Sequence, residues 1–306
     1  MSGYGPMRFG AEKTLINLLL KLVQMLPRRW ALAWGRGLGW LVYHLDGRHR
    51  RVALANVAIA FPRAAPGEAK AIVRRSFQFF GAYILDMLSL LNRGLESARF
   101  ADFEFAGVEH REAAYARGKG AIFFSGHYGP WEMMALAHGW QGHPMGVVVR
   151  ELDNPHLEAL LQRFRTLTGN FIIEKTQAFR PMLKAMRENK GLAIMIDQNE
   201  SSKNRLFVDF FGRPAATTPA VALLKIKTDA ALIPVISLPL PGNRYRFTYL
   251  PEVEISRSGD RDQDILAYTQ ACTAVLEEQI RAQPDYWLWM HRRWKTRPDG
   301  ESPPQN

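Results

Sequence analysis

His127 and Glu132 lie five positions apart in the segment SGHYGPWE, and their types and spacing could carry out proton transfer. The segment follows the apolar run 121–124, and Pro130 suits the first turn of a helix because its missing N–H would be unpaired there anyway. We therefore predict a strand, a tight turn that carries His127, and a helix with Glu132 in its first turn. In that geometry the carboxylate can reach back to one imidazole nitrogen and leave the other to accept a proton.

The same two residues also have a purely structural interpretation. Local backbone groups can satisfy a histidine after a strand, and a glutamate in a first turn stabilises the positive end of a helix. Ser125 lies close by, but the GxSxG elbow of the α/β-hydrolases is absent, so a serine acyl-enzyme is not expected. If His127 is a base, its proton comes most simply from a substrate hydroxyl. Spacing alone leaves both interpretations open.

Two further charged residues follow predicted strands. Arg150 ends the run 145–149, and Asp197 ends the run 191–196, where a charge after a buried segment needs a partner. A structural salt bridge is one interpretation of Asp197. Because chemistry in α/β folds lies at the carboxyl ends of strands, these residues are expected to gather near His127 at one edge of the sheet.

Arg165 lies on a predicted helix that begins at Pro155 and carries an apolar stripe. A guanidinium group recognises phosphate through two parallel hydrogen bonds, so an arginine here, or Arg150, could bind an anion. The alternative for Arg165 is a solvated position on the helix face.

The chain from about residue 121 alternates short apolar runs with helical patterns. This alternation predicts an α/β fold with a central, largely parallel sheet flanked by helices. The predicted strands are 121–126, 145–150, 171–175, 191–197, 231–238 and 245–255, and the predicted helices are 67–92, 131–139, 155–168, 178–189, 218–227 and 263–283. We expect one catalytic domain over 66–298 and a disordered polar tail over 299–306.

Residues 1–65 are predicted to form a helical segment that associates with a membrane. The apolar run 14–26 is too short to span a bilayer, and the stretch after it is rich in Trp and closes in Arg48, His49, Arg50 and Arg51. Such a pattern suits the head-group region of an anionic leaflet. The alternative is a helical hairpin that packs on the protein's own core.

The composition favours an acidic partner but does not choose among classes. The 306 residues carry 40 Lys+Arg against 29 Asp+Glu, a formal charge of +11 that suits nucleic acid, phospholipid or an acidic carrier protein. The single cysteine, Cys272, rules out an internal disulfide, and no histidine or cysteine spacing predicts a metal site. The segment 287–295, WLWMHRRWK, could stack on bases, or face a membrane interface or a phosphorylated sugar.

The segment SGHYGPWE resembles the signature of the bacterial lipid A biosynthesis acyltransferases, the lauroyl and myristoyl transferase family, which also contains phosphatidylinositol mannoside acyltransferases. Further blocks agree in order at 55–62, 148–170, 196–224, 232–235 and 286–298. The resemblance covers roughly residues 14 to 298. Several ordered blocks are far more specific than one motif.

The resemblance implies the fold of the glycerolipid acyltransferases and their His-x4-acidic mechanism. His127 would take a proton from an acceptor hydroxyl, Glu132 would orient the imidazole, and Arg165 would bind phosphate or polarise the thioester. Asp197 would be a functional acid of the site, paired with an arginine or Gln198.

The resemblance also implies the substrates and the location. No cofactor is expected. The acyl donor would be acyl carrier protein or coenzyme A in thioester form, and the acceptor a Kdo-bearing lipid A precursor. The protein would lie on the cytoplasmic face of the inner membrane, as a peripheral or monotopic protein, without nucleic acid as a partner.

Two alternatives differ in substrate or class. One is an acyltransferase for another membrane lipid, such as a phosphatidylinositol mannoside, a lysophospholipid or an aminolipid. The other is a basic nucleic-acid-binding protein, whose binding would depend on salt and survive the loss of His127.

Overall fold

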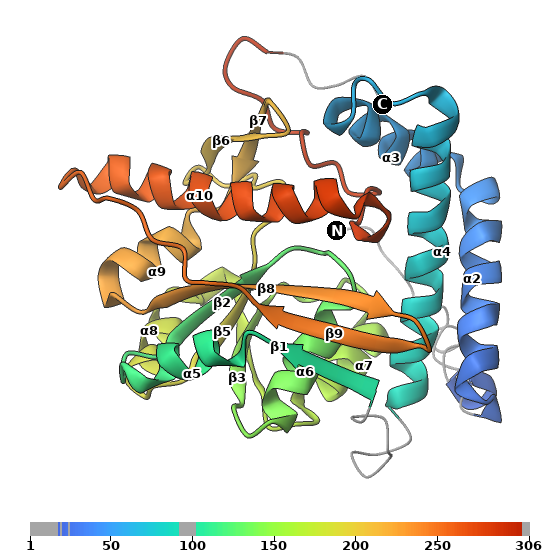
Figure 1. Ribbon diagram of the computed structural model, residues 1–306, viewed down its shortest axis with the longest axis horizontal. Coiled ribbons are helices and arrows are strands. Elements are labelled where there is room, and N and C mark those ends of the chain that lie inside the picture. The colour runs from blue at the N-terminus through green and yellow to red at the C-terminus, as the bar shows by residue number, and fades with distance from the viewer. Residues whose placement is uncertain (1–17, 19, 24, 92–101, 302–306) are drawn as a thin grey trace.

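A seven-stranded sheet forms the centre of the computed structural model, which describes residues 18, 20–23, 25–91 and 102–301 (Figure 1). The spatial order is β1-β9-β8-β2-β5-β3-β4, and every neighbouring pair is parallel except β8 and β9. The strands are β1 (Phe103–Ala106), β2 (Ala121–Ser125), β3 (Met145–Val149), β4 (Phe171–Glu174), β5 (Gly191–Met195), β8 (Ala231–Leu240) and β9 (Arg244–Tyr249). The predicted α/β fold with a mostly parallel sheet is confirmed.

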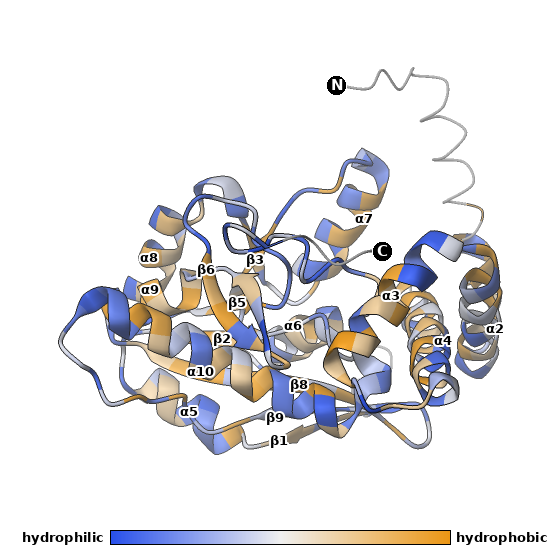
Figure 2. Ribbon diagram, turned by 90° about the horizontal axis from the view of Figure 1, so that it is seen from above, coloured by the Kyte–Doolittle hydropathy of each residue, from blue (hydrophilic) through white to orange (hydrophobic). Residues whose placement is uncertain are grey.

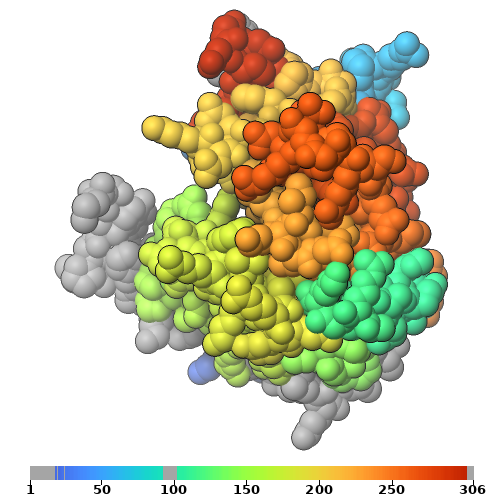
Figure 3. Space-filling view, turned by 90° about the vertical axis from the view of Figure 1, so that its left-hand side faces the viewer, coloured from blue at the N-terminus to red at the C-terminus, as the bar shows by residue number. Residues whose placement is uncertain are grey.

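Helices cover both faces of this sheet. One face packs against α5 (Val108–Ala116), α6 (Trp131–Trp140) and α7 (Pro155–Thr166), and the other against α8 (Phe179–Arg187), α9 (Ala220–Thr228) and α10 (Arg261–Ala282). Successive side chains of a strand point to opposite faces, so Phe123 of β2 joins the first layer while Ile122 and Phe124 join the second. Figure 3 shows α5, α8, α9 and α10 together on one face of the molecule, the side opposite α2 in Figure 1.

Most predicted elements are present, with ends that shift by a few residues. The strand predicted over 245–255 ends at Tyr249, and α5 and β1 had no prediction. A separate antiparallel hairpin, β6 (Leu206–Phe210) with β7 (Arg213–Thr217), was also missed. Its two-residue turn places Phe211 and Gly212 at positive φ, a conformation that Asn-Gly usually signals. Phe211 is held in this conformation by a hydrogen bond from its backbone N–H to the Glu277 carboxylate and by a cation–π contact with Arg281.

The N-terminal region is helical, as predicted. It contains α2 (Arg28–Leu45) and α3 (Gly47–Ala60), and the long helix predicted after Pro66 is α4 (Pro66–Leu90). Short 3-10 segments, η2 (Lys175–Gln177) and η3 (Pro284–Tyr286), complete the elements. The start of the apolar run 14–26 and most of the tail 299–306 lie outside the described residues.

Helix α2 presents two different faces. On one side Gly35 and Gly39 press against Gly81 of α4, and a Cβ at Gly39 would lie 2.2 Å from the Phe77 carbonyl oxygen. On the other side Trp30, Trp34, Leu38, Leu41 and Leu45 form an exposed apolar stripe, here called the α2 stripe. The alternative of a hairpin packed on the core therefore holds for one face only (Figure 2). Within the described ranges, no helix combines the length and the apolar character that crossing a bilayer requires.

Glycines of α2 provide a matched test of this contact. Gly39→Ala is expected to lower the free energy of unfolding by about 1–3 kcal/mol, because the new methyl group meets backbone atoms of α4 that cannot move aside. Gly37→Ala meets nothing within 4 Å and should raise stability by about 0.5–1 kcal/mol through helix propensity. Denaturant titration of both variants measures the difference. Equal effects would mean that α2 does not pack on α4 in this way.

Candidate active site

His127 and Asp197 meet at the carboxyl ends of two neighbouring parallel strands. His127 follows β2, Asp197 follows β5, and the register of the pair aligns Ser125 with Met195. The His127 Nδ1 atom lies 2.8 Å from the Asp197 Oδ1 atom. The predicted gathering of chemistry at this edge of the sheet is thus confirmed for these two residues.

Two glycines give the turn around His127 its shape. A Cβ at Gly126 would lie 3.0 Å from the carboxyl carbon of Asp197, so a side chain there would push the acid away from the histidine. Gly129 has a φ of +62°, and a Cβ there would lie 1.7 Å from the Ser237 carbonyl oxygen. The backbone of 286–288 then fixes the turn, since Leu288 N donates to the His127 carbonyl and Gly129 N donates to the Tyr286 carbonyl.

The Asp197 carboxylate is buried and accepts three hydrogen bonds. Besides the imidazole contact, its Oδ2 atom accepts from the His127 backbone N–H at 2.7 Å and from the Trp287 indole N–H at 2.8 Å. Burial alone would raise the pKa of this carboxyl, but the charge of His127 and these donors lower it to about 2. Asp197 is therefore a fixed anion beside the imidazole.

The remaining nitrogen of His127 is available for proton transfer. Because Nδ1 donates to the anion, Nε2 carries the lone pair, and it lies 3.2 Å from the Gln198 side-chain amide nitrogen. Burial lowers the pKa of His127, whereas the charge and hydrogen bond of Asp197 raise it, and the net result lies above the ordinary value. The Trp131 ring packs against the imidazole with its centroid 5.0 Å away.

Glu132 does not orient His127, contrary to the prediction. Arg165 holds both carboxylate oxygens of Glu132, with Nε donating to Oε2 at 2.8 Å and Nη2 donating to Oε1 at 2.5 Å. The backbone N–H of Glu132 donates to the Tyr83 hydroxyl. The carboxylate therefore bridges α6 to α7, and Asp197 occupies the position at Nδ1 that we had assigned to Glu132. The ion pair still acts on the pKa of His127, which Glu132 raises and Arg165 lowers.

The arginines differ in their surroundings. Arg165 is buried within its ion pair rather than solvated on a helix face, so phosphate binding by it stays a prediction. Arg150 is exposed and lies 3.6 Å from the carboxylate of Asp153, beyond the end of β3. The structure thus does not place Arg150 against His127. The prediction that an arginine or Gln198 pairs with Asp197 is also wrong, because Asp197 is hydrogen-bonded to His127 and Trp287.

The tryptophans and one arginine of the segment 287–295 lie in the core, whereas Arg292 and Lys295 are exposed. Trp287, Trp289, Trp294 and Arg293 are each at most 1% exposed. Arg293 donates to the carbonyls of Gln198 and Ala216, and burial lowers the pKa of Arg293 to about 10. These buried rings cannot stack on bases or face a membrane, so those two interpretations of the segment are wrong, while contact with a phosphorylated sugar stays a prediction.

Trp287 is the residue of the site that sequence reasoning missed. Its signal was the aromatic segment itself, but pairing that segment with Asp197 requires the tertiary contact that brings residues ninety positions apart together. In the parts of the chain that the structure describes, no three histidine, cysteine or acidic side chains are grouped to hold a metal ion.

The fold and the site define an α/β protein in which a buried acid is hydrogen-bonded to a histidine at the carboxyl ends of two neighbouring strands. The sequence pattern of the family described as bacterial lipid A biosynthesis acyltransferase matches residues 8–296. The chain belongs to this family and is an acyltransferase of the lipid A biosynthesis type.

Relatives with assigned names agree with this family. The chain is 28% identical to the lipid A biosynthesis lauroyltransferase of Escherichia coli over 92% of this chain and 90% of that one. It is 27% identical to the phosphatidylinositol mannoside acyltransferase of Mycobacterium tuberculosis, over 86% and 81% of the two chains, and 24% identical to the Escherichia coli lipid A biosynthesis myristoyltransferase, over 87% and 81%. By their names these relatives all transfer acyl groups, and the names differ in the acyl chain or in the lipid.

Two substitutions around Asp197 should move the pKa of His127 in opposite directions. Asp197→Asn removes the anion and leaves the effect of burial, so the pKa of His127 should fall. Trp287→Phe removes one donor from Asp197, which leaves more negative charge facing the imidazole, so the pKa of His127 should rise. Titration of the imidazole signals by NMR measures both.

Trp294→Phe is the matched control for Trp287→Phe. Trp294 is as deeply buried, but its indole N–H has no hydrogen-bond partner within the described residues. This variant should leave the His127 titration unchanged. A shift of the same sign and size in both variants would assign the effect to packing and contradict the role of the Trp287 N–H.

Proposed function

We propose that this acyltransferase moves a fatty acyl chain from an acyl carrier protein thioester, or from coenzyme A, to a hydroxyl of a Kdo-bearing lipid A precursor. The observation that carries the mechanism is the hydrogen-bonded series from Trp287 through Asp197 to His127, which leaves Nε2 as a base. The family supplies the reaction class.

In the proposed reaction, the acceptor hydroxyl takes the place of the Gln198 amide at His127 Nε2. The base removes the proton as the hydroxyl oxygen attacks the thioester carbonyl, and Asp197 stabilises the imidazolium that forms. Collapse of the tetrahedral intermediate expels the thiolate, which recovers the proton from His127. The thioester is already activated, so the protein mainly positions it and stabilises the oxyanion, and no acyl-enzyme is required.

Glu132 and Arg165 have a supporting part in this proposal. Their ion pair joins α6 to α7 close to His127 and is largely buried. Removal of either partner would leave a buried charge unpaired, a loss that typically costs about 3–5 kcal/mol. We propose that this pair sets the position of the helix that follows the catalytic turn.

A membrane surface is the proposed location. The α2 stripe exposes two tryptophans and three leucines at helical spacing, and the chain carries a formal charge of +11. An exposed apolar stripe with basic residues nearby suits a helix that lies in the head-group region of an anionic leaflet. The cytoplasmic face of the inner membrane, where the acceptor would be presented, fits these features.

Transfer to the proposed acceptor is the direct test. Membranes that contain the protein, incubated with a tetraacylated Kdo-lipid A precursor and acyl carrier protein thioesters, should yield a product heavier by one acyl chain in mass spectrometry. His127→Ala should lower the rate by about 10²–10⁴-fold, because the general base is lost. No mass gain over the common chain lengths would contradict this acceptor.

A phosphatidylinositol mannoside is the second candidate acceptor, because a relative that is 27% identical carries that name. The same assay with this lipid separates the two. A mass gain on it alone, abolished in His127→Ala, would replace the acceptor and keep the mechanism.

The pH dependence tests the role of Asp197. His127 must be neutral to accept a proton, and its pKa lies above the ordinary histidine value, so kcat/KM should fall as pH drops through that raised pKa. Asp197→Asn lowers the pKa of His127, so the acid limb should move to lower pH while the plateau falls by about 10²–10⁴-fold. An unmoved acid limb would mean that another group limits the rate.

A further inference from the structure

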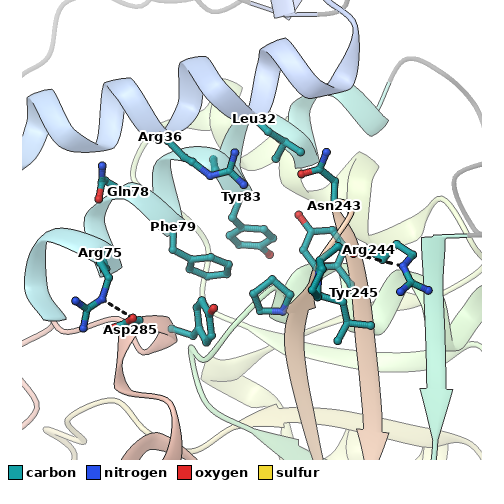
Figure 4. Close-up of a pocket in the computed structure, with 15 residues that line it drawn as sticks. Leu32, Arg36, Arg75, Gln78, Phe79, Tyr83, Asn243, Arg244, Tyr245 and Asp285 are labelled. Carbon is teal, nitrogen blue, oxygen red and sulfur yellow. Dashed lines mark hydrogen bonds and ion pairs between the residues drawn. The ribbon is translucent and has the colours of Figure 1, made fainter. Parts of the chain in front are cut away.

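A cavity of about 450 Å³ lies beside the catalytic region, between α2, α4, the β8–β9 hairpin and η3 (Figure 4). Its volume falls within the range of roughly 300–1,000 Å³ that small-molecule sites occupy. No step of the proposed reaction uses this cavity.

Aromatic rings form much of the cavity wall. Phe79 and Tyr83 come from α4, Tyr245 from β9 and Tyr286 from η3. The hydroxyls of Tyr83 and Tyr245 are engaged elsewhere, by the Glu132 backbone N–H and by the Asp86 carboxylate. The wall is therefore suited to hydrocarbon.

Three arginines and one carboxylate line the same cavity. Arg75 is paired with Asp285 at 2.6 Å, and Arg244 is paired with Glu104. Arg36 forms no ion pair with any residue that the structure describes, and Figure 4 shows its guanidinium group extended from α2 over Tyr83. The cavity thus combines an apolar wall with one uncompensated cation, a combination that fits an anionic amphiphile.

The position of Arg36 relates the cavity to the α2 stripe. Both lie on α2, but Arg36 points away from the stripe, toward α4 and the cavity. Trp40 lies one turn further along on the same side as Arg36 and is exposed, so an apolar side chain that can enter the acyl region stands beside this arginine. When a helix lies in the interface with its apolar side chains in the acyl region, its arginines are at the level of lipid phosphates. A phospholipid of the same leaflet could then place its phosphate at Arg36.

We propose that this cavity binds the phosphate-bearing head group of an anionic membrane phospholipid that is not the acyl acceptor. Arg36 contacts the phosphate, and the aromatic wall covers the glycerol and the first methylene groups. The occupant is distinct from the acceptor because His127 does not line the cavity, and Trp131 packs against both places. Its ring centroid lies 5.2 Å from that of Tyr83 and 5.0 Å from that of His127.

The bound lipid would fix the height of the active site above the membrane. Tyr83 lines the cavity, and its hydroxyl accepts the N–H of Glu132 in the first turn of α6. A head group held against this ring therefore lies one aromatic layer from His127.

Calorimetric titration of the full-length protein with dihexanoyl phosphatidylglycerol below its micelle concentration tests this site. We expect saturable binding that Arg36→Gln weakens about tenfold or more, through loss of a charge-assisted contact. Arg29→Gln is the matched control, because Arg29 is exposed on the same helix and does not line the cavity. It should leave the affinity within about twofold.

A second variant tests the cavity without a change of charge. Gln78 lines the cavity and is half-buried, so Gln78→Trp should fill part of the volume and weaken binding, with thermal unfolding as the check that the variant is folded. Inorganic phosphate should bind far more weakly than the lipid, since it makes no contact with the aromatic wall.

Four results would overturn the proposal. These are the absence of saturable binding, equal loss in Arg36→Gln and Arg29→Gln, equal affinity for dihexanoyl phosphatidylcholine, and equal affinity for inorganic phosphate. The second would indicate general surface charge, the third an apolar site, and the fourth a site for the free anion. Acyl transfer activity enters none of these measurements, so failure here is distinct from failure of the proposed reaction.

Discussion

The charge of Asp197 is the constraint on which the active site depends. A carboxylate taken out of water is costly unless donors surround it, and here the donors come from the turn after β2 and from Trp287 near the C-terminus. Each donor fixes the place of its own segment. Satisfying one buried charge therefore brings together the end of β5, the turn that carries His127 and a segment ninety residues further along the chain.

The buried aromatic segment 287–295 follows from the same constraint. The Trp287 indole can reach Asp197 only if its backbone is held, and Ser76 of α4 donates to the Trp287 carbonyl while Asn56 of α3 donates to the carbonyls of Trp289 and His291. Helices α3 and α4 thus hold the backbone of 287–291, and that backbone positions the Trp287 indole against Asp197. In this arrangement α3, from the predicted N-terminal segment, and α4, from the predicted catalytic domain, both bind the backbone that carries Trp287, Trp289 and His291.

Local pattern was enough to predict six of the seven strands of the sheet, most of the helices and the turn that carries His127, because apolar period and the Pro130 signal depend on neighbouring residues. The partner of His127 was a different problem. Glu132 was the nearest acid along the chain, whereas Asp197 is the nearest in space because β5 lies next to β2. The order of the strands in the sheet depends on how whole layers pack, so it cannot be predicted from the spacing of residues in the sequence. Arg165 was found as a residue of the site, but its ion pair with Glu132 depends on the contact between α6 and α7.

Helix α2 carries both the close contact with α4 and the exposed stripe that would meet the membrane. Its glycines permit a backbone approach to α4 that larger side chains would prevent, and this close contact leaves the opposite face free to carry Trp and Leu in the α2 stripe. The same close packing puts α4, and with it Tyr83, directly beneath the helix that would meet the membrane. An enzyme that acts only in water gains nothing from an exposed stripe of this kind, since exposed apolar side chains favour association with other molecules. An enzyme whose acceptor hydroxyl is attached to a membrane lipid gains a fixed distance between the bilayer surface and the base that must reach that hydroxyl.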